Sequence, residues 1–192
     1  PYATARDIVL EADPEIAVYE CGCRSTRADP CQPTQVCMVV GQPFVDFVLE
    51  HNPETSRRVT QAEALKLLQE EHARGHMHAA YFKDVMFNRF YAICNCCGCC
   101  CAGIEAMKRG VPMVTSSGYV AQVDASRCEG CRTCEHACPF DAIQVNGSAS
   151  INWEKCMGCG VCEGQCPNHV ISLARDERKG LPLDVHHLKA LN

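Results

Sequence analysis

The most regular pattern of apolar and polar residues lies in the middle of the chain and predicts an α-helix. Thr60 is followed three residues later by Glu63, the spacing of a capping box, in which each side chain accepts a hydrogen bond from the other residue's backbone N–H. Leu65 and Leu68 then fall on one helix face. Gly75 stands where a glycine commonly ends a helix, so we expect the helix to run from Thr60 to about Gly75.

Shorter patterns predict a second helix and several strands. The segment 99–109 ends in two basic residues and Gly110, which favours a helix there. Polar and apolar residues alternate at 76–78, as they do in a short strand. Asn146-Gly147 is a strong turn signal for a β-hairpin. Four more short strands are expected in the last third of the chain, at 119–123, 142–145, 150–153 and 170–173.

The distribution of cysteine divides the chain into three parts. Residues 1–118 hold ten cysteines, residues 119–173 hold eight in two copies of one motif, and residues 174–192 form a charged tail without cysteine. Each copy has a strand before and after its loop, so the repeat predicts two β–loop–α–β halves related by a pseudo-twofold axis. The expected fold class is α+β, with this C-terminal domain packed on a cysteine-rich N-terminal α+β module.

Composition and charge narrow the classes of function. The chain has 192 residues, 18 cysteines and a formal net charge of −5. A mildly acidic chain with scattered basic residues argues against nucleic-acid binding, and no apolar run reaches the ~18 residues of a membrane helix. The glycine-rich motifs that bind nucleotide phosphates and the HExxH motif of zinc proteases are absent from the sequence. The N-terminal residues carry no apolar signal segment, so we expect a cytoplasmic protein.

The repeated motif C-x2-C-x2-C-x3-C-P favours iron–sulfur ligation. Three thiolates two residues apart can bind three corners of one small cluster, while the fourth faces away and binds the cluster of the other copy. A zinc site uses four cysteines, whereas this repeat has eight. We therefore expect two [4Fe–4S] clusters, with Cys128, Cys131, Cys134 and Cys166 as ligands of the first and Cys156, Cys159, Cys162 and Cys138 as ligands of the second.

The region 119–173 resembles the bacterial ferredoxins that carry two [4Fe–4S] clusters. The resemblance implies the α+β ferredoxin fold and one-electron transfer at low potential. Each cluster with its four thiolates adds about −2 charges, so two clusters would bring the net charge from −5 to about −9. A strongly negative surface favours a redox partner with a basic docking surface.

The other ten cysteines form a loose N-terminal set and a dense run at 94–101. Within the run, Cys94, Cys97 and Cys100 make a CxxCxxC triad without a fourth ligand of its own. The N-terminal cysteines either supply that ligand or form a separate set of four. We expect one or two further iron–sulfur clusters, with zinc or buried free thiols as alternatives. The candidate ligands are Cys21, Cys23, Cys31, Cys37, Cys94, Cys96, Cys97, Cys99, Cys100 and Cys101.

The order of these features resembles anaerobe-type proteins with a 4Fe–4S dicluster domain and an extra cysteine-rich N-terminal module. The matching features are CGCR at 21–24, the helix after Thr60, the run ICNCCGCCC and the C-terminal repeat. The resemblance implies an electron-transfer subunit or partner of a larger oxidoreductase. Cys-Cys-Gly at 96–98 is similar to an element of heterodisulfide reductase catalytic subunits. It suggests an alternative, a disulfide-reductase-like enzyme with a catalytic cluster at 94–101, and a redox sensor is a third possibility.

Three polar residues are weaker candidates for a role at a metal site. Arg24 follows Cys23 directly, so it could lower the pKa of a thiol or donate a hydrogen bond near a cluster. A surface arginine is the alternative. His76 and His78 share a predicted strand face and are candidate metal ligands, with ordinary polar histidines as the alternative.

Overall fold

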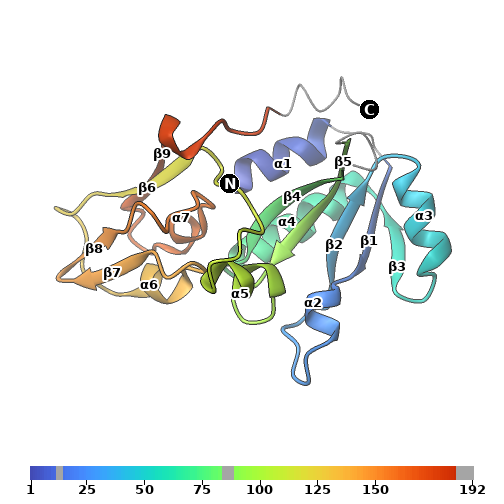
Figure 1. The fold of residues 1–192 in the computed structure, drawn as a ribbon, viewed down its shortest axis with the longest axis horizontal. Helices are drawn as coiled ribbons and strands as arrows, with labels where there is room; N and C mark the ends of the chain where they lie inside the picture. Colours follow the sequence, from blue (N-terminus) through green and yellow to red (C-terminus); the bar gives the residue numbers. More distant parts are fainter. Residues whose placement is uncertain (12–14, 84–88, 185–192) are drawn as a thin grey trace.

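The computed structural model describes residues 1–11, 15–83 and 89–184, and a five-stranded antiparallel sheet organises its N-terminal part (Figure 1). The strands are β1 (Ile16–Glu20), β2 (Gln35–Val40), β3 (Ser56–Val59), β4 (Met77–Lys83) and β5 (Arg89–Cys96). Their order in the sheet is β3-β1-β2-β5-β4. β2 pairs with β5 through Met38 and Ile93, which brings the two cysteine-rich segments of this part together.

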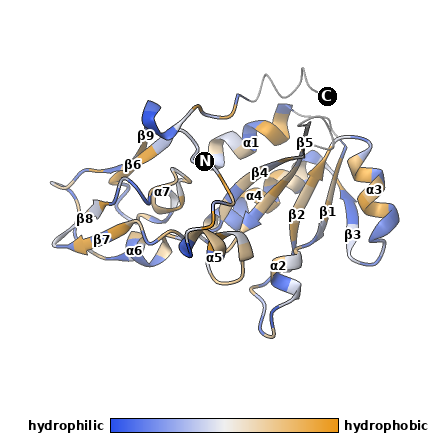
Figure 2. Ribbon diagram, viewed as in Figure 1, coloured by the Kyte–Doolittle hydropathy of each residue, from blue (hydrophilic) through white to orange (hydrophobic). Residues whose placement is uncertain are grey.

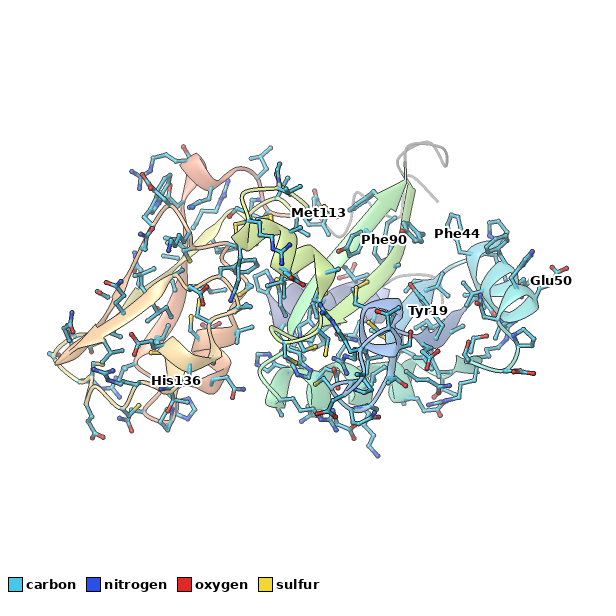
Figure 3. All side chains as sticks on the ribbon, turned by 60° about the horizontal axis from the view of Figure 1, so that its bottom comes forward. Tyr19, Phe44, Glu50, Phe90, Met113 and His136 are labelled. Atoms are coloured by element: carbon cyan, nitrogen blue, oxygen red, sulfur yellow. The ribbon has the colours of Figure 1, made fainter. Side chains whose placement is uncertain are left out.

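Helices cover both faces of this sheet. The helices of this part are α1 (Tyr2–Glu11), α2 (Gly22–Ser25), α3 (Phe44–His51), α4 (Gln61–Ala73) and α5 (Ala102–Lys108). Ile16 and Val18 of β1 pack with α1 and α4, whereas Ala17 between them packs with α3. Tyr19 and Phe44, labelled in Figure 3, contact this second core. Figure 2 shows the hydrophobic colouring of β1 and β2, which is typical of strands buried on both faces.

The capping box at the start of α4 is confirmed. The Thr60 hydroxyl accepts a hydrogen bond from the Glu63 N–H at 3.2 Å, and the Glu63 carboxylate accepts one from the Thr60 N–H at 2.8 Å. The helix ends at Ala73, two residues before Gly75, whose φ of 78° lies in the left-handed region that glycine adopts freely. Leu68 is fully buried against the sheet. Local sequence signals therefore determine where the helix begins and ends, and its apolar face determines how the helix packs on the sheet.

Removing the cap at α4 should weaken the N-terminal part. Thr60→Ala is expected to lower the free energy of unfolding by about 1 kcal/mol, because the N–H of Glu63 loses its acceptor. Urea unfolding followed by far-UV circular dichroism measures the change. Thr60→Ser keeps the hydroxyl and should stay close to the parent protein. A Thr60→Ser variant as unstable as Thr60→Ala would contradict the capping explanation.

The C-terminal part contains two short antiparallel sheets and two short helices. Its elements are β6 (Tyr119–Val123), α6 (Thr133–Ala137), β7 (Ile143–Asn146), β8 (Ser148–Ile151), α7 (Val161–Gln165), β9 (Ile171–Arg175) and the 3-10 turn η2 (Glu177–Lys179). β6 pairs with β9, and β7 pairs with β8. Gly147, with φ of 79°, forms the turn of the β7–β8 hairpin, as the sequence predicts. The chain is therefore a mixed α and β protein with antiparallel sheets.

Two sequence predictions need correction at their boundaries. The helix expected at 99–109 begins only at Ala102, because Cys101 is its N-cap and residues 97–101 form a turn. The tail expected from residue 174 begins with two residues that still belong to β9. Leu183 then packs against the core of the N-terminal part. The last eight residues of the expected tail, 185–192, lie outside the described residues.

The N-terminal and C-terminal parts share one hydrophobic core. Met77, Cys96 and Ile104 pack in the same cluster of buried residues as the cysteines of the C-terminal repeat. The side-chain amide of Gln165 donates hydrogen bonds to the last carbonyls of α4, at 3.2 and 3.1 Å. Lys108 forms an ion pair with Asp141 at 3.0 Å. None of the described helices is long and apolar enough to cross a membrane.

Candidate metal centres

The two repeated loops of the C-terminal part have the same backbone plan. In each loop the third cysteine lies in a short helix, and the fourth follows that helix in extended conformation. A residue with left-handed backbone precedes each helix: Arg132 with φ of 65°, and Gly160 with φ of 81°. The first three cysteines of each loop therefore lie around the inside of that loop. The fourth cysteine follows the helix and lies away from the first three.

Two small cavities lie between the loops, and four cysteines line each. Cys138 lies beside three cysteines of the second loop, and Cys166 lies beside three of the first. The first cavity is lined by Cys138, Cys156, Cys159 and Cys162, and the second by Cys128, Cys131, Cys134 and Cys166. These are the two sets expected from the spacing. The structure therefore brings each expected set together, and ligation itself stays a prediction.

Backbone N–H groups point at sulfur in this region. The N–H of Ala121 in β6 lies 3.5 Å from the Cys156 sulfur, and the N–H of Ala149 in β8 lies 3.4 Å from the Cys128 sulfur. In each case the strand belongs to one copy and the cysteine to the other. Donors of this kind stabilise thiolates and set cluster potentials, so these cysteines fit an iron–sulfur cluster.

Burial controls the protonation of these thiols when they hold no metal. Burial raises the pKa of the Cys159 thiol to about 11. The pKa of Cys162 is also raised, first by burial and then by the neighbouring Cys159. Such thiols stay protonated at neutral pH, whereas coordination to a metal deprotonates a thiol outright. Metal loading and deprotonation therefore occur together here.

Nine of the ten remaining cysteines fall into two groups, an inner and an outer one. Figure 3 shows sulfur atoms between α2 and α5 as well as in the C-terminal part. The inner group is a row of neighbouring thiols. The Cys37 and Cys94 sulfurs are 3.9 Å apart, because the β2–β5 register places these two residues opposite each other. The row consists of Cys21, Cys37, Cys94, Cys96 and Cys101, each in side-chain contact with the next. Cys23, the tenth, packs beside Cys21 and Cys37.

The outer group joins the loop after α2 to the turn before α5. The sulfurs of Cys31, Cys97 and Cys99 all lie within 4.8 Å of one another. The Cys100 sulfur lies 3.6 Å from that of Cys99 and accepts a hydrogen bond from the Cys31 N–H at 3.4 Å. Burial alone would raise the pKa of Cys97, but the Cys100 N–H, the Cys99 thiol and the charge of Arg24 together lower it.

The two groups differ from both sets that the spacing suggested. The expected triad is divided, because Cys94 lies in the inner group while Cys97 and Cys100 lie in the outer one. The expected N-terminal set is divided as well, since Cys31 lies with Cys97 and Cys99, and Cys21 lies with Cys37. The reason is that β5 continues to Cys96 and the chain turns only after it.

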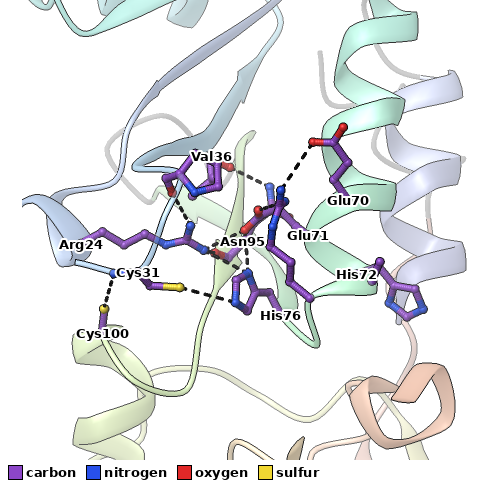
Figure 4. Close-up of polar contacts among 12 residues, drawn as sticks. Arg24, Cys31, Val36, Glu70, Glu71, His72, His76, Asn95 and Cys100 are labelled. Carbon is purple, nitrogen blue, oxygen red and sulfur yellow. Dashed lines mark hydrogen bonds and ion pairs between the residues drawn. The ribbon is translucent and has the colours of Figure 1, made fainter. Parts of the chain in front are cut away.

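A buried polar network stands behind the outer group (Figure 4). The Arg24 guanidinium is 1% exposed and pairs with the fully buried Glu71 carboxylate at 2.8 Å. It also donates to the backbone carbonyls of Asn95, at 2.9 Å, and Pro33. Burial alone would raise the pKa of Glu71, but hydrogen bonds with His76 and Arg24 hold it below its usual value.

His76 connects this network to the outer group. Its Nδ1 lies 2.7 Å from the Glu71 carboxylate, and its Nε2 lies 3.8 Å from the Cys31 sulfur (Figure 4). His78 instead contacts Asn95 at 2.6 Å. The sequence indicates Arg24 and His76 as candidates, but it does not indicate that Glu71 is buried beside them. In the sequence Glu71 looks like any exposed glutamate of a helix, and only the tertiary structure buries it.

A larger cavity of ≈ 450 Å³ lies between α1, β4 and the segment 113–117. Cys159 of the C-terminal repeat is on its wall, together with His78 and Tyr81. Its lining includes no cysteine of the run 94–101. The reductase alternative places a substrate beside that run, so this cavity gives it no support.

Comparison with known proteins identifies the C-terminal part. A family model described as a 4Fe-4S binding domain matches residues 121–144 and again residues 149–172. Each match covers one copy of the repeated motif with part of each flanking strand. No curated protein matches the chain. The matched residues form a ferredoxin-type 4Fe–4S-binding region, and the two matches lie outside residues 1–118.

Proposed function

We propose that this protein transfers single electrons through several [4Fe–4S] clusters. Two clusters are held in the C-terminal part, one by Cys128, Cys131, Cys134 and Cys166 and the other by Cys138, Cys156, Cys159 and Cys162. The two cavities lined by these sulfurs carry the proposal. When bound, each cluster accepts and releases one electron, at a potential set by burial and by hydrogen bonds to sulfur.

The proposed arrangement has a pseudo-twofold axis between the two copies. Ala121 and Ala149 hold corresponding positions in β6 and β8, and each donates its N–H to the first cysteine of the other copy. The fourth cysteines also cross between copies, since Cys138 and Cys166 line the cavity of the opposite loop. Crossed ligation of this kind brings the two clusters close together, which favours electron transfer between them.

We place a third cluster at the inner group. Its thiols come from segments around residues 21, 37, 94 and 101 and form a row of successive neighbours. Cys96 and Cys101 belong to the same buried cluster as the cysteines of the C-terminal repeat, so the third site is continuous with the first two. This continuity extends the electron path into the N-terminal part.

The proposed partner is a larger oxidoreductase subunit that receives or supplies the electrons. With the three proposed clusters the net charge becomes about −11, so the partner should present a basic surface. Electrostatic attraction of this kind raises the association rate and weakens with added salt. No substrate has to bind to this chain for such a role.

Metal and sulfide analysis of anaerobically purified protein tests this proposal. We expect about 12 iron and about 12 acid-labile sulfide per chain, four for each of three clusters. Cys131→Ser should lower both by about four. Fewer than about eight of each in fully loaded protein would contradict the central proposal, and about eight would remove the third cluster.

Electron paramagnetic resonance of reduced variants tests the crossed ligation. Cys166→Ser should remove the same signal as Cys131→Ser, because both residues line one cavity. Cys159→Ser is the matched control for the other cavity and should remove the other signal. If Cys166→Ser instead reproduced the spectrum of Cys159→Ser, the fourth cysteine would serve its own copy and the crossed arrangement would be wrong.

A further inference from the structure

We propose that the outer group, Cys31, Cys97, Cys99 and Cys100, binds a single zinc ion that takes no part in electron transfer. This inference goes beyond the proposed function and does not depend on it. The sulfurs of Cys31, Cys97 and Cys99 come from two distant segments and lie within 4.8 Å of one another, and that of Cys100 lies 3.6 Å from Cys99. The clusters proposed above do not use these four cysteines.

The spacing of the sulfurs fits one tetrahedral ion. A zinc–sulfur distance of about 2.3 Å in a tetrahedron places the sulfurs about 3.8 Å from one another. The Cys99 and Cys100 sulfurs are 3.6 Å apart, and those of Cys31, Cys97 and Cys99 lie within 4.8 Å of one another. Three sulfurs therefore lie near the spacing of one ion, and Cys100, beside Cys99, is the fourth ligand that we propose.

The same spacing argues against an iron–sulfur cluster at this place. In a [4Fe–4S] cluster each cysteine binds a different iron at a different corner, so the sulfurs stand farther apart. In the part of the chain that the structure describes, neither the C-terminal repeat nor the inner group contains three cysteines whose sulfurs all lie within 4.8 Å of one another. Among the described residues, the group of Cys31, Cys97 and Cys99 is the one set of three or more possible ligands with all its ligand atoms within 4.8 Å.

The surrounding structure holds the four residues in place. The Cys31 N–H donates to the Cys100 sulfur at 3.4 Å. The Arg27 guanidinium donates to the Cys100 carbonyl at 3.2 Å and pairs with Glu105 at 2.9 Å. His76 approaches the Cys31 sulfur from the side of the buried Glu71. Arg27 therefore lies close to a centre that would carry about −2 charges with four thiolates and Zn²⁺.

Zinc is the metal that this donor set favours. Soft thiolates in a tetrahedral set of four select zinc or iron–sulfur chemistry, and the mutual closeness of Cys31, Cys97 and Cys99 favours a single ion. A closed site of four cysteines, with no position left for substrate, is typical of structural zinc. Here the ion would tie the loop after α2 to the turn between β5 and α5, and so fix the run that also supplies the inner group.

Zinc and iron counted on the same anaerobic sample of the full chain test the proposal. We expect about one zinc per chain, with four sulfur neighbours at about 2.3 Å in X-ray absorption at the zinc edge. Cys31→Ser and Cys99→Ser should each lose the zinc and keep the iron and sulfide of the C-terminal clusters. Cys23→Ser is the matched control, because Cys23 belongs to neither group and packs beside Cys21 and Cys37, and it should keep the zinc.

Other results would overturn the assignment. Iron and sulfide that fall with the Cys31→Ser change would show a cluster, and one iron without sulfide would show a mononuclear iron site. If His76→Ala loses the zinc while Cys100→Ser keeps it, His76 and not Cys100 is the fourth ligand, and the four-cysteine assignment is wrong. If a variant fails to fold, Co²⁺ is put in place of zinc in the parent protein. Tetrahedral Co²⁺ bound by thiolates has a characteristic absorption spectrum, and its absence would contradict the proposed site. Failure of the proposed function would appear separately, as low iron and sulfide.

Discussion

Glu71→Ala is expected to lower the free energy of unfolding by about 3–5 kcal/mol. Glu71 is fully buried in α4, and its carboxylate pairs with Arg24, which is 1% exposed. Removing the carboxylate leaves the guanidinium buried without a counter-charge, and it also takes the hydrogen-bond partner from His76. Both losses fall on groups that water cannot reach, so the full desolvation cost remains.

Urea unfolding of the anaerobic protein, followed by circular dichroism and by cluster absorbance, measures this loss. Asp46→Ala is the matched control, because the Arg58–Asp46 pair has the same 2.8 Å separation but lies in solvent, with side chains 47% and 64% exposed. An exposed pair contributes about 0–1 kcal/mol. Equal effects of the two substitutions would show that the burial of the Arg24–Glu71 pair adds nothing.

Local signals were sufficient for the helix α4 and for the repeat. The capping box and Gly75 lie within a few residues of the ends that they define, so one sequence reveals them. The strands β6 to β9 flank a motif whose spacing is dictated by cluster chemistry. Their predicted bounds agree with the structure within one or two residues.

The sheet order and the grouping of the ten other cysteines depend on long-range pairing. The CxxCxxC spacing suggested one metal for Cys94, Cys97 and Cys100, but a strand through Cys96 gives side chains a period of two. Cys94 and Cys96 therefore share a face, and the pairing of β5 with β2 brings Cys37 to Cys94. Nothing local in the sequence specifies that pairing.

The burial of Arg24 shows the same limit. The sequence alone is equally compatible with Arg24 on the surface and with Arg24 beside a thiol. Its place is decided by three acceptors, Glu71, Asn95 and Pro33, which come from α4, β5 and a loop. These elements meet only in the folded chain, so the network that positions His76 had no signal in the sequence.

Gly158→Ala is expected to destabilise the C-terminal part by about 2–5 kcal/mol, from a left-handed backbone cost of about 1–2 and overpacking of about 1–3. Gly158 lies in the second cysteine loop with φ of 63°. A Cβ atom there would overlap the Tyr119 carbonyl and the Ser117 hydroxyl. Tyr119 begins β6, whose Ala121 donates to Cys156, so relief of the overlap separates a hydrogen-bond donor from its sulfur.

Iron analysis and urea unfolding of the same sample separate the two causes of this effect. Gly147→Ala is the control, because Gly147 has a similar φ of 79° but no atom within 4 Å of the added Cβ. It should cost only the backbone contribution, about 1–2 kcal/mol, and keep all the iron. Gly158→Ala should in addition lose about four iron, the content of the cluster proposed beside it. A Gly158→Ala protein that matched Gly147→Ala in both measurements would mean that β6 does not fix the second loop, and the N–H of Ala121 would then have no part in holding that cluster.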